Sequence, residues 1–297
     1  MDDIFTKLKQ TFLSGNILIK LIYINIGAFL LLRLSAVLFL LFNIHGVPFL
    51  EYLQMPSSPT LLLTRPWTLL TYMFTHYDFL HILFNMLWLY WFGGVFLQFF
   101  NERRFGGVYL LGGIAGALLF LSAYNIFPYF QAVSGRSFLM GASASVMAIV
   151  FAISFYRKEY EINLFLIGRV KLIWLAWFTL ILDLLAITSA NAGGHLAHIG
   201  GALFGIWYAS RMKKGKDLTA PVNRMIDRLV NLTKENPLKR KPKMKVTYKR
   251  PETDYEYNAR KNRENKDLDD ILDRLKRSGY DSLSAEEKKR LFDASKK

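Results

Sequence analysis

One stretch of the chain, Ala197-His198-Ile199-Gly200-Gly201-Ala202-Leu203-Phe204-Gly205, combines small and apolar residues with a single ionisable side chain. A second apolar stretch opens with Gly141-Ala142-Ser143-Ala144, which places a hydroxyl group at its start. Polar side chains are costly in the hydrocarbon region of a bilayer, so Ser143 and His198 indicate a functional site before they indicate packing. Together the two stretches predict a helical membrane domain with a candidate site inside it.

Other apolar segments of the chain support this prediction. A transmembrane helix needs roughly 20 mainly apolar residues, and six stretches reach or nearly reach that length. The fourth stretch is short, so Ser143 at its start is expected below the membrane surface. The six predicted spans are Leu21–Ile44, Leu80–Phe100, Gly107–Tyr124, Gly141–Phe155, Leu164–Thr188 and Gly194–Ser210.

Lysine and arginine residues predict the orientation of these spans. Loops rich in these residues stay on the cytoplasmic side, and they precede span one and follow spans two, four and six. Both termini are therefore predicted to be cytoplasmic. The even-numbered spans then begin near the outer face, where four polar side chains reach one depth and could share a water-accessible cavity: His81, Asn85, Ser143 and His198.

Ser143 and His198 are suited to nucleophilic catalysis. Serine attacks a carbonyl group when a base takes its proton, and imidazole is the usual base. The oxyanion that forms needs fixed hydrogen-bond donors, for which we expect Asn85, His81 and the Ser143 backbone N–H. The chain has no cysteine, so thiolate nucleophiles, disulfides and cysteine-ligated metal sites are excluded.

Three glycines are expected to support this site. Gly141 permits a tight turn before the serine. Gly201 and Gly205 leave one face of span six without side chains, so that its backbone can approach span four closely. That approach would bring His198 to Ser143.

Several separated motifs resemble those of the rhomboid family of intramembrane serine proteases. Gly141-Ala142-Ser143 is similar to the family's G-x-S nucleophile motif, and Ala197-His198-x-x-Gly201-x-x-x-Gly205 is similar to its histidine motif. His81-x-x-x-Asn85 is similar to its H-x-x-x-N motif. The resemblance covers residues 17–210.

This resemblance implies an all-α membrane protein, with six transmembrane helices in a rhomboid-like bundle. A Ser143–His198 dyad below the outer surface would cleave peptide bonds in or near transmembrane segments of substrates that enter from the bilayer. The resemblance implies no metal or cofactor, and a bacterial-type inner membrane as location. The alternative is a catalytically silent rhomboid-like protein that binds transmembrane segments for quality control or trafficking. A transporter is disfavoured, since paired intramembrane charges and inverted repeats are missing.

Other positions in the first loop and the spans either match or depart from the family pattern. His76 and Trp67 match positions that the family often fills. Met147 stands where some bacterial members have tyrosine, Thr68 where many have arginine, and Gln98 where glutamate is expected. These departures affect the expected orientation of the histidine base and the anchoring of the first loop, not the reaction class.

Competing residues surround the predicted dyad. Ser145 and Ser137 are alternative nucleophiles that lack the Gly-x-Ser pattern. His195 competes for the role of base and is interpreted as a loop or capping residue. Asp78 and Asp183 are the available acids, and both are interpreted as structural hydrogen-bonding or capping residues. No metal site is expected, because no carboxylate accompanies the histidines at ligand spacing.

The predicted domains are a cytoplasmic N-terminus (1–16), the membrane domain (17–210), a basic disordered linker (211–263) and a small cytoplasmic helical hairpin (264–297). Residues 211–297 hold 26 Lys+Arg, against 12 in 1–210. This suits contact with anionic lipid better than nucleic-acid binding, which is not expected. The hairpin has few apolar residues, so we expect it to dock on an unknown partner or the membrane domain, or to fold only in part.

Overall fold

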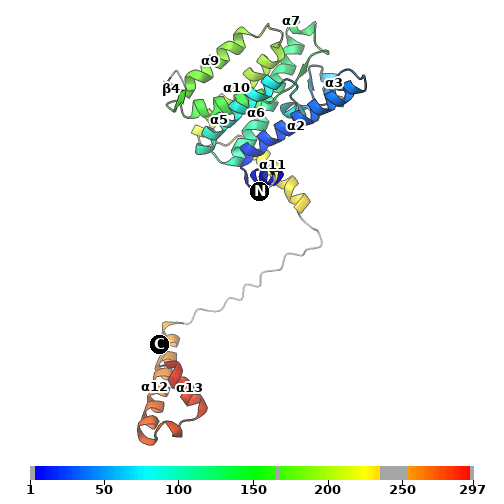
Figure 1. The fold of residues 1–297 in the computed structure, drawn as a ribbon. Coiled ribbons are helices and arrows are strands. Elements are labelled where there is room, and N and C mark those ends of the chain that lie inside the picture. Colours follow the sequence, from blue (N-terminus) through cyan, green and yellow to red (C-terminus); the bar gives the residue numbers. More distant parts are fainter. Residues whose placement is uncertain (1–3, 165–167, 235–252, 295–297) are drawn as a thin grey trace. The chain divides into compact units, whose positions relative to one another are not determined.

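The computed structural model describes residues 4–164, 168–234 and 253–294, which are mostly helical (Figure 1). The chain divides into two units, Met1–Glu235 and Asn236–Lys297. In the first unit, the short strands β1 (Met55–Pro56) and β2 (Phe138–Leu139) pair antiparallel. Its helices and 3-10 turns are α1 (Ile4–Ser14), α2 (Ile17–Leu41), η1 (Leu50–Tyr52), α3 (Pro59–Thr64), α4 (Thr68–Thr71), η2 (Tyr72–Phe74), α5 (Phe79–Phe99), α6 (Glu102–Ile126), α7 (Pro128–Gln131), α8 (Ser143–Tyr156), α9 (Leu172–Leu185), α10 (Ala192–Lys213) and α11 (Ala220–Lys234).

Each of the six predicted spans overlaps one helix, namely α2, α5, α6, α8, α9 or α10. Within the described residues, α2, α5 and α6 are long and apolar enough to cross a membrane, judged by length and composition. α8 and α9 are apolar but have only 14 residues each. The mostly helical fold class is confirmed, and a bilayer crossing by all six helices stays a prediction.

The predicted fifth span, Leu164–Thr188, is wrong at its start. β3 (Glu161–Leu164) and β4 (Gly168–Lys171) form an antiparallel hairpin, and α9 begins only at Leu172. Gly168 has a φ of +87°, a left-handed conformation that suits a hairpin turn and that a helix does not use. Leu164 and Val170 lie in these strands, although both belong to the predicted span.

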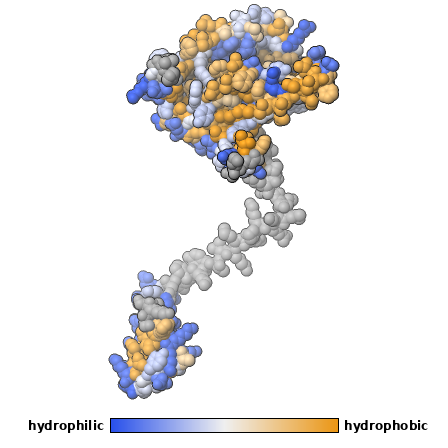
Figure 2. Space-filling model, viewed as in Figure 1, coloured by the Kyte–Doolittle hydropathy of each residue, from blue (hydrophilic) through white to orange (hydrophobic). Residues whose placement is uncertain are grey.

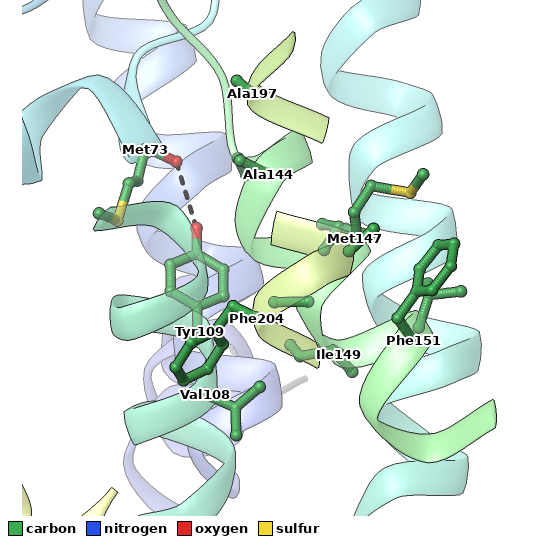
Figure 3. Close-up of a cluster of buried hydrophobic side chains, with 14 of the residues drawn as sticks. Met73, Val108, Tyr109, Ala144, Met147, Ile149, Phe151, Ala197 and Phe204 are labelled. Carbon is green, nitrogen blue, oxygen red and sulfur yellow. Dashed lines mark hydrogen bonds between the residues drawn. The ribbon is translucent and has the colours of Figure 1, made fainter. Parts of the chain in front are cut away.

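The centre of the first unit is α8. All of its residues from Ala144 to Ser154 are buried, against α10, α6 and α5. Figure 3 shows part of the apolar cluster around it, where Tyr109 of α6 donates a hydrogen bond to the Met73 carbonyl at 3.2 Å. A helix that is apolar on every side suits such a central position.

Glycine and alanine residues set the distance between α8 and its neighbours. A Cβ atom placed on Gly201 of α10 would overlap the Ala144 carbonyl oxygen, and one on Gly205 would overlap the Ala148 carbonyl oxygen. On another side of α8, a Cβ on Gly116 of α6 would lie 2.5 Å from the Ala144 Cβ. Small residues at such points let helix backbones approach closely. The close approach of α10 to α8 that the sequence predicts is present.

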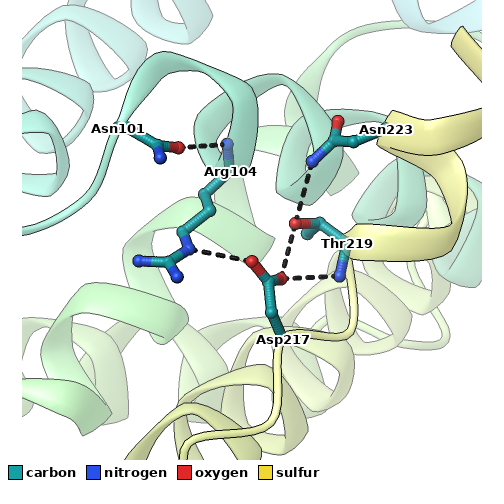
Figure 4. Close-up of polar contacts among 5 residues, drawn as sticks. All are labelled: Asn101, Arg104, Asp217, Thr219 and Asn223. Atoms are coloured by element: carbon teal, nitrogen blue, oxygen red, sulfur yellow. Dashed lines mark hydrogen bonds and ion pairs between the residues drawn. The ribbon is translucent and has the colours of Figure 1, made fainter. Parts of the chain in front are cut away.

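Polar contacts join α11 to the start of α6 (Figure 4). Asp217 accepts hydrogen bonds from Arg104 Nε at 2.8 Å and from the Thr219 N–H at 2.9 Å. Burial raises the pKa of Asp217, but the hydrogen bonds from Thr219 and Arg104 outweigh it and hold this pKa below its usual value. Asn223 of α11 donates to the Thr219 hydroxyl at 3.2 Å. The segment after α10 is therefore held against the helical bundle.

The second unit is a helical hairpin of α12 (Asp254–Ser278), η3 (Tyr280–Ser282) and α13 (Ala285–Ala294). A capping box lies at the start of the last helix. The Ser284 N–H donates to Glu287 Oε2 at 2.9 Å, and the Glu287 N–H donates to Ser284 Oγ at 3.3 Å.

The predicted linker, 211–263, differs from the structure at both ends. α11 lies inside it and packs on α6, and α12 begins ten residues before the predicted hairpin with a capping box between Thr253 and Glu256. Residues 235–252 lie outside the described residues. The helical spacing of apolar residues in α11 outweighs the basic composition on which the linker prediction rested.

We expect Gly205→Ala to destabilise the protein, because the added methyl group would overlap backbone atoms of α8. Overpacking of this kind lowers the free energy of unfolding by about 1–3 kcal/mol. Gly94→Ala in α5 is the matched control, since a Cβ there meets nothing within 4 Å. The free energy of unfolding of both variants would be measured in mixed micelles. Equal values for the two variants would contradict the close packing of α10 on α8.

Candidate active site

A cavity of about 470 Å³ lies between α5, α8, α9 and α10. The four polar side chains that the sequence placed at one depth all line it: His81, Asn85, Ser143 and His198. The structure therefore brings the predicted site residues together, while their catalytic roles stay a prediction. The apolar part of the wall includes Leu80, Phe84, Trp88, Val146, Met147 and Leu182.

Ser143 is the first residue of α8, directly after a tight turn. Gly141 in this turn has a φ of +114°, and a Cβ there would lie 2.8 Å from His81 Nε2. Glycine is required on both counts, and His81 lies against the chain just before the serine. Backbone N–H groups in the first turn of a helix have no partner within that helix, so the Ser143 N–H is a donor that α8 itself leaves unused.

No hydrogen bond joins the Ser143 hydroxyl to the His198 ring in the described part of the chain, although both line the cavity. Catalytic hydrogen bonds in ligand-free enzymes are often long and tighten when substrate binds. The arrangement therefore suits a Ser–His pair that closes with substrate in place.

His76 connects Asn85 to the turn before Ser143. Its ring is fully buried, and its Nε2 accepts a hydrogen bond from the Ala142 N–H at 3.2 Å. The same Nε2 lies 3.2 Å from Asn85 Nδ2. Because this nitrogen is an acceptor, Asn85 donates one amide proton to it and keeps the second for the cavity. The sequence identified His76 only as a family match, and this anchoring contact depends on the tertiary structure.

Asp183, near the end of α9, contacts two histidines of α10. Its Oδ1 lies 2.8 Å from His195 Nδ1 and 2.9 Å from His198 Nδ1. The interpretation of His195 as a loop or capping residue is wrong, because it lies within α10, one turn before His198, and both rings reach the same carboxylate. The short connection between α9 and α10 makes them antiparallel neighbours, and this signal could have predicted the contact. Asp78 caps α5, where its carboxylate accepts the His81 N–H at 2.9 Å.

A carboxylate does accompany two of the histidines at ligand spacing, contrary to the prediction from the sequence. Asp183, His195 and His198 place three possible ligand atoms within 4.8 Å of one another. Zinc bonds of about 2.0–2.1 Å would separate tetrahedral ligand atoms by about 3.3 Å. The observed N···O distances are shorter and are those of hydrogen bonds, which explain the cluster without an ion.

The loop before α5 is anchored without the arginine that Thr68 replaces. Trp67 Nε1 donates a hydrogen bond to the Tyr52 carbonyl at 2.8 Å, and the Arg65 guanidinium carbon lies 3.9 Å from the centre of the Tyr52 ring. Thr68 is buried and donates to the Arg65 carbonyl at 2.7 Å. Met147, another departure, lines the cavity.

Two known family models match parts of this chain. The family model of the rhomboid domain matches residues 63–214, a range that contains every residue lining the cavity. The chain belongs to the rhomboid family. A second family model, described as a family of unknown function (DUF6576), matches residues 252–297 of this rhomboid-family chain, which include the helical hairpin.

Curated relatives of this rhomboid-family chain come from bacteria and mitochondria. Rhomboid protease GlpG of Haemophilus influenzae is 34% identical over 148 residues, which are 48% of this chain and 67% of GlpG. The human presenilin-associated rhomboid-like protein, mitochondrial, is 29% identical over 150 residues, 46% of this chain and 35% of the relative. RHOMBOID-like protein 12, mitochondrial, of Arabidopsis thaliana is 28% identical over 194 residues, 61% and 57% of the two chains. The chain therefore spans only part of the length of these mitochondrial relatives.

Acid is expected to destabilise the protein through His76, which lies in the loop before α5. Burial, assisted by the nearby His81, lowers the pKa of His76 to about 3. The unfolded chain takes up this proton near pH 6.5 and the folded chain does not, so stability falls as the pH drops from about 6.5 towards 3, by up to about 1.4 kcal/mol per pH unit.

The variant His76→Gln keeps an acceptor for Ala142 but cannot titrate. The free energy of unfolding of both proteins is measured at pH 7 and at pH 5. Between these two values it should fall by about 2 kcal/mol more in wild type than in His76→Gln. Identical pH dependence of the two proteins would mean that His76 is not held neutral in the fold.

Proposed function

We propose that this rhomboid-family chain is an intramembrane serine endopeptidase that cleaves membrane proteins in or near their transmembrane segments. The observation that carries the proposal is the shared cavity, in which Ser143 and His198 meet two donors, His81 and Asn85. These side chains come from three helices and converge on one cavity of a mainly apolar bundle, where polar groups need a functional reason. The relative named as a rhomboid protease supports the same reaction class.

In the proposed mechanism, His198 takes the hydroxyl proton of Ser143 while the serine oxygen bonds to the substrate carbonyl carbon. Asn85, His81 and the Ser143 N–H donate to the oxyanion, and losing one such donor costs about 3 kcal/mol of transition-state stabilisation. The C–N bond then breaks, and His198 gives its proton to the leaving amine. A water molecule, deprotonated by His198, hydrolyses the acyl-enzyme and restores the serine.

The substrate class follows from the cavity wall. Apolar side chains of α5, α8 and α9 surround the polar residues, so an extended apolar peptide fits better than a charged one. The short fourth span predicts that α8 starts below the membrane surface. A start at that depth would suit a transmembrane segment that enters from the bilayer and unwinds locally. Unwinding exposes the backbone carbonyl that the serine must reach.

A catalytically silent relative that binds transmembrane segments is the second candidate function. It would use the same apolar wall and bind without cleavage. The presence of both Ser143 and His198 in the cavity favours the protease.

The proposed location is a bacterial-type inner membrane, with both termini cytoplasmic and the site near the outer face. Arg103 and Arg104 at the start of α6 and Arg211 and Lys213 at the end of α10 favour this orientation. Both helix ends lie away from Ser143, because α5 and α10 run from the cavity towards them.

The catalytic roles are tested by replacing Ser143 and His198 with alanine in protein reconstituted with a membrane-anchored reporter. Each variant should lower kcat by at least about 10³-fold, because nucleophile and base act as one unit. Ser145→Ala is the matched control, since that hydroxyl is fully buried and has no hydrogen-bond partner among the described residues. Cleavage that survives in both site variants would reject the protease, and retained reporter binding without any wild-type cleavage would favour the silent relative.

The orientation is tested with variants that each carry one introduced cysteine. The chain has no cysteine of its own, so the introduced thiol is the single reactive group. Ser189→Cys, in the connection between α9 and α10, should react with a membrane-impermeant maleimide added outside intact cells. Lys214→Cys, after α10, should react only once the membrane is permeabilised. The reverse pattern would overturn the proposed orientation.

A further inference from the structure

We infer that Asp183 is a positioning residue for His198, so that a carboxylate stands behind the proposed dyad. The inference rests on the proposed function and concerns how its base is prepared. Asp183 Oδ1 and His198 Nδ1 are 2.9 Å apart. An ionised carboxylate only accepts hydrogen bonds, so Nδ1 must carry the ring proton. The lone pair then resides on Nε2, the nitrogen that a general base presents to a serine hydroxyl.

Because Asp183 is buried, its carboxylate needs hydrogen-bond donors from the protein. Among the described residues, Asp183 is the only aspartate or glutamate classed as buried, with 6% of its surface exposed. A buried carboxylate is costly unless it is paired and hydrogen-bonded. The two imidazole N–H groups of His195 and His198 meet this need through one oxygen atom.

His195 has a different place in the cluster from His198. Its Nδ1 lies 2.8 Å from the same Asp183 oxygen, and its ring stands at 80° to that of His198, with centroids 5.8 Å apart. It therefore holds the carboxylate from a second direction and restricts its rotation. His195 fixes Asp183, and Asp183 fixes the ring of His198.

The other acid near the cavity is already engaged. The Asp78 carboxylate accepts the His81 N–H and caps α5, which leaves it bonded to backbone and not to an imidazole. Of the two candidate acids, only Asp183 is within hydrogen-bonding distance of the imidazole ring of a histidine that lines the cavity, among the described residues.

Asp183→Asn tests the inference in the full-length, reconstituted protein. An amide can donate a proton to Nδ1 and so stabilise the wrong ring tautomer, which lowers kcat by about 10²- to 10⁴-fold. KM should stay within about threefold, because the Asp183 carboxylate is buried against the two imidazole rings. His195→Gln should lower kcat by less than about tenfold, since the bond between Asp183 and His198 remains. Asp78→Asn is the matched control and should keep wild-type kcat, because asparagine caps helices as well as aspartate does.

A spectroscopic measurement separates positioning from a purely structural role. In ¹⁵N NMR of histidine-labelled protein, the His198 signals, assigned by their loss in His198→Gln, should report a protonated Nδ1 in wild type and a changed tautomer in Asp183→Asn. A structural role would lower the thermal midpoint and leave the tautomer of the folded protein unchanged. Wild-type kcat and an unchanged tautomer in Asp183→Asn would overturn the inference, as would activity that a chelator abolishes.

The two levels of the proposal fail separately. If Ser143→Ala still cleaves the reporter, the proposed function fails. If Ser143→Ala is inactive while Asp183→Asn is as active as wild type, the protease stands and only the positioning role of Asp183 is rejected.

Discussion

The close contact between α10 and α8 is the constraint on which the rest of the structure depends. Gly201 and Gly205 bring the α10 backbone against the carbonyl oxygens of Ala144 and Ala148. Lipid provides no hydrophobic force that would hold helices together, so packing of this kind and hydrogen bonds between helices supply the association. The same contact carries His198 to the cavity at the start of α8. Fold and candidate site therefore depend on the same few small residues.

Hydropathy along the sequence is enough to predict the helices that are apolar over most of their length. Each of the six predicted spans overlaps one helix of the structure. The start of α9 could not be read in this way, because apolar residues of the β3–β4 hairpin add to the same hydropathy. α11 was missed for the opposite reason, since its average composition is basic while its apolar residues recur with helical spacing.

The candidate site shows a similar division. Residue type and spacing predict a serine, a histidine and two donors, and the structure places all of them on one cavity. The side chains that orient them, His76 behind Asn85 and Asp183 behind His198, could not be read from spacing. Each of these contacts joins segments whose register is set only when the helices pack. A polar residue in a span is visible in the sequence, and its partner becomes visible in the fold.

The length of α9 has a consequence for the surrounding bilayer. Its 14 residues rise about 21 Å, while the hydrocarbon core of a typical bilayer is about 30 Å thick. Its exposed side chains include Trp174 and Phe178, which suit contact with lipid tails. If α9 crosses the bilayer as predicted, local thinning of the lipid would relieve this hydrophobic mismatch. Headgroups drawn inward beside α9 would then shorten the path from bulk water to the cavity that Ser143 lines.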